Sequence, residues 1–126
     1  MRSLLKIILI FTILFSSNPL FAKKKIKDRG PIAIVTVAPN YPRAAAEQGI
    51  EGEVTLEFTI TTTGTVTNPV VIASNPEKLF DREALRAILK YKFAPAIKKQ
   101  KAIQIRVSQT LSFKLPDGYQ PHLIDK

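Results

Sequence analysis

Two segments far apart in this sequence alternate between apolar and polar residues. The segment from Glu53 to Thr61 reads EVTLEFTIT, and the segment from Ile103 to Leu115, near the end of the chain, reads IQIRVSQTLSFKL. Because successive side chains of a β-strand point to opposite faces, this period of two predicts strands with one buried and one exposed face. The chain therefore has to fold around a sheet, and the first question is what the last strand pairs with.

The first of these strands continues into a hairpin. Thr62-Thr63-Gly64 predicts a turn in which Gly64 takes a positive φ, and Val66 to Ala73 predicts the returning strand. Pro69 interrupts the returning strand, and a proline cannot donate a hydrogen bond to a ladder. We therefore expect this strand to lie at a sheet edge or to carry a bulge at Pro69.

Two helices are predicted around the hairpin. Before it, Asn40 to Gly49 predicts a short helix, with Pro42 suited to the first helical position. After it, Phe80 to Phe93 reads FDREALRAILKYKF and carries apolar residues at helical spacing, with acids near its start and lysines near its end. Pro95 is expected to stop this helix, and a basic loop, Lys98 to Lys101, leads into the last strand.

The order of these elements predicts an α+β fold. We expect a three-stranded sheet of antiparallel or mixed type, arranged as a split βαβ unit, with the two helices packed on one face. Glu53 to Thr61 has the most regular pattern and is placed at the centre, with its hairpin partner on one edge. The last strand then takes the other side, which leaves one edge of Ile103 to Leu115 without a partner.

The N-terminal residues predict export. Residues 1–22 carry Arg2 and Lys6, then a largely apolar stretch, then the polar run Ser16 to Pro19, which is the layout of a cleaved signal peptide. An uncleaved membrane anchor is the less favoured alternative, because the apolar stretch has about half of the roughly 20 residues that a spanning helix needs. Export of either kind implies a bacterium-like envelope, with the periplasm as the expected compartment and the inner membrane as the alternative.

Residues 23–36 are predicted to form a basic linker. Its lysines favour a solvated tether, with adhesion to anionic lipid or polymer as the alternative. Within and just beyond it, Ile32 to Val37 is apolar or β-branched throughout and predicts a short strand. We expect one folded domain over residues 37–116 and a tail over residues 117–126.

Composition limits the remaining function classes. The chain has 126 residues, enough for one domain, and a formal net charge of +9, which allows attraction to anionic membranes, envelope polymers or nucleic acid. It has no Cys and no nucleotide-binding or zinc-protease motif. His122 lies in the predicted tail, and Glu53 and Glu57 alternate with threonines of a polar strand face, so none of them suggests catalysis. We expect no enzyme, no metal, no cofactor and, for an exported chain without exposed aromatic residues among its basic clusters, no nucleic-acid partner.

Several short blocks of this chain occur in the same order in a known family. They are Tyr41-Pro42, Gly49 to Val54, Gly64-Thr65-Val66, Phe80-Asp81 with Ala84, and Tyr91 to Pro95, followed by IRVSQTLSFKL. Through these blocks the chain resembles the C-terminal domain of the TonB family over Val37 to Leu115. The resemblance implies a periplasmic module that grips a short peptide, the TonB box of an outer-membrane transporter, by strand addition. It also implies that the module passes on work from a proton-driven inner-membrane motor.

The chain also departs from the family pattern. Family transducers carry an uncleaved membrane helix, commonly with a histidine that meets the motor, and a long proline-rich spacer, whereas residues 1–22 contain no histidine and no such spacer follows. From Ala22 to Pro39 the chain reaches at most about 60 Å, at roughly 3.3 to 3.6 Å per residue. A domain tethered there would stay near the inner membrane. Tyr91 stands where tryptophan is more usual, and Gln100-Lys101 replaces a frequent glycine.

The unpaired edge of the last strand is the predicted binding site. The peptide is expected to add to the main chain of Gln104, Ile105, Arg106, Val107, Ser108, Gln109 and Thr110. We interpret Arg106, on the polar face, as a solvated arginine, with attraction of an acidic peptide as the alternative.

Three occupants of this edge stay open. They are a peptide of an outer-membrane transporter, a second copy of the same strand in a homodimer, and Ile32 to Val37 folded back in the same chain. We favour the peptide, and we expect contact with the inner-membrane motor only if the N-terminus is uncleaved. The alternative function is a basic envelope-adhesion or scaffold protein that uses the same fold without energy transduction.

Overall fold

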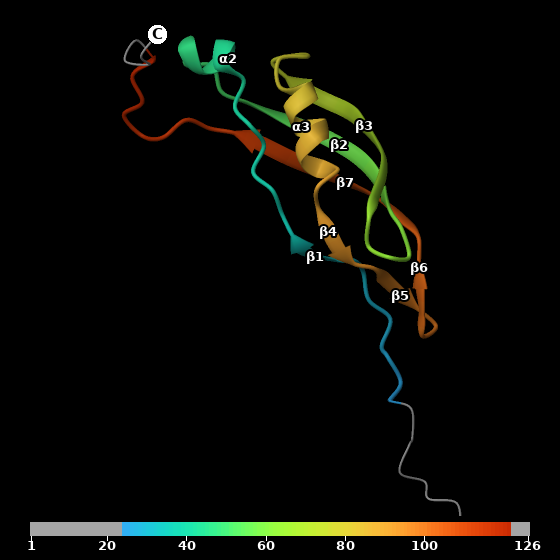
Figure 1. Ribbon diagram of the computed structural model, residues 1–126. Helices are drawn as coiled ribbons and strands as arrows, with labels where there is room; N and C mark the ends of the chain where they lie inside the picture. Colours follow the sequence, from blue (N-terminus) through green and yellow to red (C-terminus); the bar gives the residue numbers. More distant parts are fainter. Residues whose placement is uncertain (1–23, 122–126) are drawn as a thin grey trace, which may run out of the picture.

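The structure of the protein is a computed structural model that describes residues 24–121 (Figure 1). The signal peptide or anchor predicted for residues 1–22 lies outside the described residues, and so does the end of the predicted tail, including His122. Within residues 24–121, no helix has both the length and the apolar character needed to cross a bilayer.

A three-stranded antiparallel sheet forms the body of the fold. It contains β2 (Gly52–Ile60), β3 (Val66–Asn75) and β7 (Ile105–Phe113), in the order β3-β2-β7. Because β2 pairs antiparallel with both neighbours, β3 and β7 run in the same direction on either side of it. The connection between them carries α3 (Asp81–Ile88). The predicted α+β fold, with the first hairpin strand at the centre of a split βαβ unit, is confirmed.

The alternating pattern of β2 builds the core. Its four apolar residues are fully buried: Val54, Leu56, Phe58 and Ile60. The opposite face carries its acids and threonines. α3 packs across β3 and β2, with Ala84, Ala87 and Ile88 in the core, while the one-turn α2 (Arg43–Glu47) lies at one end of the sheet (Figure 1). The core is therefore a single layer of side chains on one face of the sheet, covered by α3 and, through the fully buried Ala45, by α2.

Pro69 meets both expectations that the sequence raised for it. β3 is an edge strand, and its register with β2 shifts between Glu57 and Thr59. Asn68, directly before the proline, takes a positive φ of 50°. A second shift lies further along the same pair of strands, so the outer edge of β3 is irregular as well as interrupted by a proline.

The second helix is shorter than predicted. The expectation of a helix from Phe80 to Phe93 is wrong beyond Ile88, where α3 ends, and Lys92–Ala94 forms the short strand β4. The reason is a tertiary hydrogen bond: the amide of Phe93 donates to the carbonyl of Gly64 at 2.9 Å. This bond holds the segment extended against the turn of the β2–β3 hairpin, and the buried Phe93 side chain adds apolar contact there.

The predicted basic loop and last strand are also subdivided. β5 (Ala96–Lys98) and β6 (Lys101–Ile103) form a hairpin closed by a two-residue loop, residues 99 and 100, in which both residues take a positive φ. Gln104 then separates β6 from β7. The single strand predicted from Ile103 to Leu115 is therefore two strands, and only the second belongs to the main sheet.

The segment that precedes the domain is docked onto it. β1 (Ile32–Val35) pairs antiparallel with β4. Arg29 exchanges two backbone hydrogen bonds with Ile97 of β5, at 2.9 and 2.8 Å. The carboxylate of Asp28 accepts a hydrogen bond from the amide of Lys99 at 2.8 Å. Residues 28–35 are part of the folded unit, which corrects the interpretation of this part of the linker as a solvated tether.

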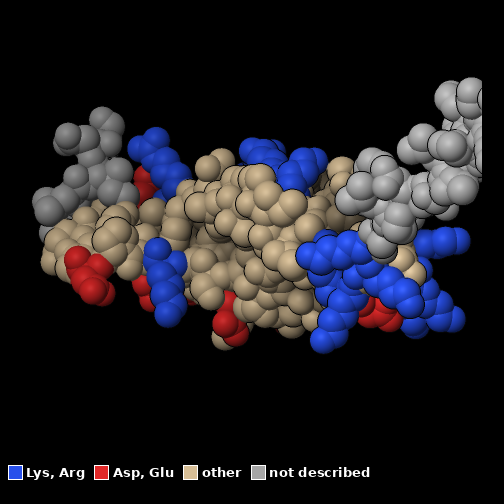
Figure 2. Space-filling view, turned by 90° about the horizontal axis from the view of Figure 1, so that it is seen from below, with Lys and Arg blue, Asp and Glu red and all other residues tan. Residues whose placement is uncertain are grey.

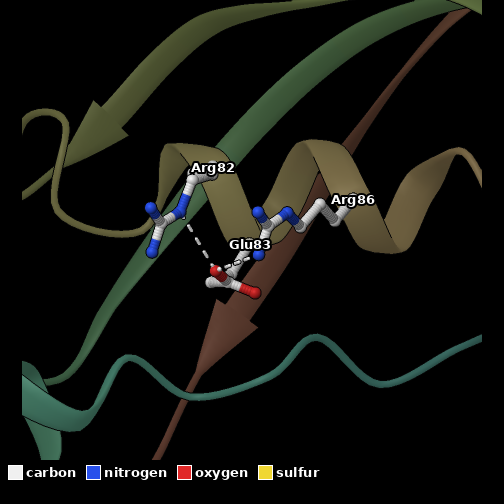
Figure 3. A network of polar contacts seen from close by, with 3 residues as sticks. All are labelled: Arg82, Glu83 and Arg86. Carbon is white, nitrogen blue, oxygen red and sulfur yellow. Dashed lines mark hydrogen bonds and ion pairs between the residues drawn. The ribbon is translucent and has the colours of Figure 1, made fainter.

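α3 carries one buried acid. The side chain of Glu83 is 9% exposed, and its Oε1 accepts hydrogen bonds from Arg82 Nε at 3.3 Å and Arg86 Nη1 at 3.2 Å (Figure 3). The carboxylate points from the helix toward the extended chain before α2, and residues 37–40 line the small cavity on this side. Because both arginines neutralise it, Glu83 can lie on the inward side of α3.

The turn of the β2–β3 hairpin can be tested at Gly64. This glycine takes φ +84°, as the sequence predicted, and a Cβ there would lie 1.8 Å from the carbonyl oxygen of Phe93. Gly118 also has a positive φ, +77°, but no atom lies within 4 Å of its Cβ position. In both alanine variants the positive φ destabilises the folded state by about 1 to 2 kcal/mol. Only Gly64→Ala must also push β4 away from the hairpin.

We expect Gly64→Ala to lower the free energy of unfolding by at least about 2 kcal/mol more than Gly118→Ala. Urea denaturation of the two variants beside the unmodified protein measures the difference. Equal losses in the two variants would contradict the close approach of β4 to the hairpin turn.

Candidate functional site: the outer edge of β7

β7 uses only one side of its backbone for pairing. Its nine residues pair with β2 in an unbroken register, from Ile105 opposite Ile60 to Phe113 opposite Gly52. No strand within residues 24–121 pairs with the other side of β7. The N–H and C=O groups that alternate residues direct away from β2 therefore have no ladder in the described part of the chain.

The residues predicted for peptide binding fall on this edge with one exception. Six of them lie consecutively in β7: Ile105, Arg106, Val107, Ser108, Gln109 and Thr110. The seventh, Gln104, lies in the break between β6 and β7 and has no partner in the β2 ladder. Gln104 therefore lies next to the edge, outside β7 itself.

The core-side face of β7 is only partly covered near this edge. Leu111 and Phe113 are buried, Ile105 and Val107 are half-buried, and Gln109 on the same face is exposed. The cause is the position of α3, which packs mainly against β3 and β2. Apolar surface from Ile105 and Val107 is thus available beside the free edge.

Arg106, on the opposite face, is tied to the sheet. Its Nε donates to Glu57 Oε1 at 2.5 Å, and its Nη1 donates to Thr59 Oγ1 at 3.1 Å and to the Asn68 carbonyl at 3.2 Å. The guanidinium therefore reaches from β7 across β2 to the bulge of β3. Arg106 is exposed, as the sequence predicted, and its charge is paired with Glu57, whose side chain is exposed to a similar extent. The sequence placed both residues on polar strand faces, but only the register brings them together.

The N-terminal strand does not cover the β7 edge. Of the three occupants that the sequence left open, the fold-back of Ile32 to Val37 is contradicted, because β1 pairs with β4 instead. β4 is held extended by its hydrogen bond to the hairpin turn, and β1 pairs with the edge that β4 offers. The β7 edge stays open in the described chain as a result.

The outer edge of β3 is the other free edge of the main sheet. It carries Pro69 and two register shifts, whereas the pairing of β7 with β2 has none. A straight, regular edge presents its donors and acceptors at the spacing an incoming strand needs, and a bulged edge does not. β7 is therefore the better template for an added strand.

An aromatic cluster fixes the C-terminal end of β7. The ring of Phe113 stacks on Phe80 with 4.4 Å between centroids, and Tyr41 meets both rings edge-on, at 5.5 Å from Phe80 and 6.0 Å from Phe113. The Tyr41 hydroxyl donates to the Ile50 carbonyl at 2.5 Å, and burial raises the pKa of Tyr41, with the charge of Glu51 adding to the effect. The cluster holds β7 in register from one end and leaves its edge free.

The arrangement presents main-chain groups and few chemically reactive side chains along this edge. Within residues 24–121, no group of three or more His, Cys, Asp or Glu could hold a metal ion. Glu53 and Glu57 lie on the polar face of β2, and Glu57 is paired with Arg106. What the edge offers is a row of backbone groups flanked by half-buried apolar side chains.

Comparison with known proteins identifies the family. The family described as Gram-negative bacterial TonB protein C-terminal matches residues 37–115, which include β2, β3, α3 and β7. The chain belongs to this family. The blocks that carried the resemblance, among them Tyr41-Pro42, Gly64 and Phe80, are the packing and turn residues of the fold described above.

Individual relatives agree with this assignment. TonB of Pseudomonas aeruginosa is 38% identical over 77 residues, which cover 61% of this chain and 22% of that protein. TonB of Vibrio cholerae is 29% identical over 100 residues, covering 79% of this chain and 41% of the relative. The chain thus spans less than half the length of these TonB proteins.

Solved structures of TonB C-terminal domains share the fold. The solution structure of the Pseudomonas aeruginosa TonB C-terminal domain has a TM-score of 0.60 at 33% identity and covers 71% of this chain and 91% of its own. The TonB2 protein of Vibrio anguillarum has a TM-score of 0.53 at 38% identity, with 82% and 97% covered. Here the similarity takes in nearly the whole of each solved domain.

The tie between Arg106 and Glu57 can be measured with a double-mutant cycle. We expect the single variants Arg106→Gln and Glu57→Gln and their combination to give a coupling of about 0.5 to 1 kcal/mol at low salt, because both side chains are about 40% exposed and solvent screens the pair. Urea denaturation near 0.05 and 0.5 M salt should show the coupling shrink by roughly half or more as salt rises.

The matched control is the pair Arg43 and Glu47 on α2, whose side chains are 72% and 48% exposed. That pair lies within one turn of a short helix and should couple by about 0.3 to 0.5 kcal/mol at most. A coupling between Arg106 and Glu57 no larger than that of the control would show that this pair does not strengthen the contact between β7 and β2.

Proposed function

We propose that this TonB C-terminal domain binds a short extended peptide by adding it as a fourth strand to the outer edge of β7. The peptide belongs to an outer-membrane transporter or another envelope protein, and binding serves energy-dependent transport across the outer membrane. The domain works in the periplasm, or at the inner membrane if the N-terminus is retained as an anchor, and it is not an enzyme. The family assignment supports the transport role, and the geometry of the β7 edge supports the binding mode.

The observation that carries the proposal is the unbroken, one-sided pairing of β7. Nine consecutive residues are held straight by β2, and no described strand pairs with their other side. A peptide laid along residues 105–110 gains four to six main-chain hydrogen bonds, which contribute about 2 to 9 kcal/mol in total. Ordering the peptide costs about 1 to 2 kcal/mol per residue, so the ladder alone gives weak binding.

Side-chain contact supplies the remaining affinity. Ile105 and Val107 are half-buried on the core-side face, next to the exposed Gln109. Alternate side chains of an added strand would lie beside these residues, and apolar side chains there would bury surface at about 25 cal/mol per Å². A peptide with apolar residues at every second position therefore fits this edge better than a uniformly polar one. The opposite face, where Arg106 is already paired, adds little charge selectivity.

Hydrogen exchange tests the added strand directly. In the free protein, alternate amides of β7 bond to β2 and are protected, and the interleaved amides exchange fast. A saturating strand-forming peptide from an outer-membrane transporter should slow the interleaved amides of residues 105–110 by about tenfold or more, since each gains a hydrogen bond. The result is a loss of the two-residue period in the exchange rates of β7.

The outer edge of β3 is the internal control for this experiment. Amides of residues 70–74 that face away from β2 should exchange at the same rate with and without peptide. Protection of β3 with no change in β7 would place the binding site on the wrong edge, and no change on either edge would remove strand addition altogether.

N-methylated peptides separate main-chain binding from side-chain binding. Only alternate amides of an added strand point toward β7, so N-methyl groups on one alternate set should abolish measurable binding. The same number of N-methyl groups on the other set should change the dissociation constant by less than about threefold, as measured by calorimetry. Equal losses for the two sets would indicate binding without a ladder.

A second copy of the domain is the competing occupant of the edge. If a homodimer forms through β7, sedimentation should show a concentration-dependent dimer that the peptide dissociates. A dimer that persists with bound peptide would use a surface other than the β7 edge. The dimer interface and the peptide site would then be independent.

A further inference from the structure

The net charge of the described chain is concentrated at one end. Residues 24–29 and 98–101 contain seven Lys and Arg against a single acid, Asp28, which is a net charge of +6. The rest of the described chain contains eight Lys and Arg and eight Asp and Glu, so it is neutral. Figure 2 shows the blue side chains crowded at this end, while the middle of the same face is mostly tan. We call residues 24–29 and 98–101 the basic end.

Contacts between two distant segments assemble the basic end. Arg29 bonds to the backbone of Ile97, and its guanidinium donates to the Pro95 carbonyl at 3.1 Å. The one acid, Asp28, already accepts the Lys99 amide. Six exposed lysines form no ion pair with any acid of the described chain: Lys24, Lys25, Lys27, Lys98, Lys99 and Lys101. Their charges are therefore free to meet an anionic surface.

Exposed apolar side chains accompany these lysines. Seven large apolar residues of the described chain are exposed, and four of them follow one another along the N-terminal segment: Ile26, Ile32, Ile34 and Val35, with exposures of 53, 55, 67 and 44%. An open groove of about 430 Å³ beside Arg29 adds the partly buried Ile97, Ile103 and Ile105. Isolated exposed isoleucines need no explanation, but here Ile26 lies between unpaired lysines and three more exposed apolar residues follow within nine positions.

We propose that the basic end docks on a membrane surface rich in anionic phospholipid. The lysines meet the headgroup phosphates, and the isoleucines of residues 26–34 enter the boundary between headgroups and acyl chains. Two observations favour this partner. An anionic polymer would use the cations and leave the isoleucines in water, and a second copy of the domain would bring one charge of +6 against another.

The position of the patch in the chain agrees with a membrane surface. Lys24, the first described residue, lies two positions after residues 1–22, the segment that the sequence predicts to meet a membrane during export. Ile105 of β7 lines the groove at this end, but the lysines and isoleucines proposed to meet the membrane all lie outside β7. Docking is therefore a property separate from peptide binding. Its effect is to hold the domain against a membrane and present the β7 edge at a fixed distance from it.

Vesicle binding of the full chain, as purified from the envelope, tests the proposal. The quantity measured is the ratio of partition coefficients on vesicles with about 30 mol% anionic phospholipid and on purely zwitterionic vesicles. If the N-terminal segment is retained, it contributes to both partition coefficients. Their ratio therefore measures only the part of the binding that depends on anionic lipid. Each surface lysine is expected to contribute roughly fivefold. Lys98→Gln with Lys101→Gln should therefore lower the ratio about 25-fold at about 0.1 M ionic strength.

The matched control removes two lysines elsewhere. Lys78→Gln with Lys114→Gln causes the same loss of net charge outside the basic end and should change the ratio by less than about threefold. Equal losses for the two double variants would mean that net charge alone drives binding, which would overturn a localised patch. Absence of any anionic-lipid dependence in the unmodified protein would overturn the proposal itself.

The apolar contribution distinguishes a membrane from an anionic polymer. Ile32→Ser with Ile34→Ser, at positions more than half exposed, should leave folding intact and weaken anionic vesicle binding by about tenfold. The chain has no tryptophan, so Ile34→Trp gives a single reporter whose emission should shift to the blue on anionic vesicles. Unchanged vesicle binding of the serine variant, or a reporter emission that stays that of a solvated indole, would assign the basic end to a soluble polyanion instead.

Discussion

The double ladder of β2 is the constraint on which the rest of this structure depends. Among the strands of residues 24–121, β2 is the one that belongs to two ladders of the main sheet, and its alternate residues supply four fully buried side chains of the core. Once its register with β3 and β7 is set, the positions of α3 over one face and of Arg106 over the other follow. A shift of one residue would turn Val54, Leu56, Phe58 and Ile60 to solvent, so the register is strongly specified.

The same pairing decides where the sheet can accept another strand. A three-stranded sheet has two outer edges. Pro69 and two register shifts make the edge of β3 irregular, whereas pairing with β2 keeps the edge of β7 straight over nine residues. Natural proteins usually protect such a straight edge against aggregation. Here the exposed polar residues of β7 limit unspecific contact on one face, and the half-buried Ile105 and Val107 keep apolar surface on the other. The asymmetry between the two edges is what makes one of them suited to recognition.

The sequence predicted the elements whose pattern is local and missed those that depend on tertiary contact. The alternation of β2 and β7, the positive φ of Gly64 and the interruption at Pro69 can all be read from neighbouring residues. The end of α3 at Ile88 could not be read in this way. It depends on the hydrogen bond from the Phe93 amide to the Gly64 carbonyl, 29 residues earlier in the chain. The pairing of Arg106 with Glu57 likewise needs the register, and the docking of Arg29 on Ile97 joins segments with no shared pattern. The sequence predicted that Ile105 to Thr110 lie on a free strand edge, and they do. It also placed Gln104 in the same strand, because the alternation of apolar and polar residues continues through the break between β6 and β7.

The structure also implies an order of local stability along the chain. β2 and its two neighbours share long ladders and the buried core. Residues 28–35 are held by two backbone bonds at Arg29, by the side-chain bonds of Asp28 and Arg29, and by a four-residue strand with exposed side chains. Segments with few buried apolar contacts open at lower free energy than core strands. A load applied between the N-terminal segment and a peptide on β7 would therefore separate β1 from β4 before it disturbed the β2–β7 ladder. The chain released in this way would lengthen the link to the N-terminus by about 3.3 Å per residue, while the binding edge, which β2 supports from behind, would keep its shape.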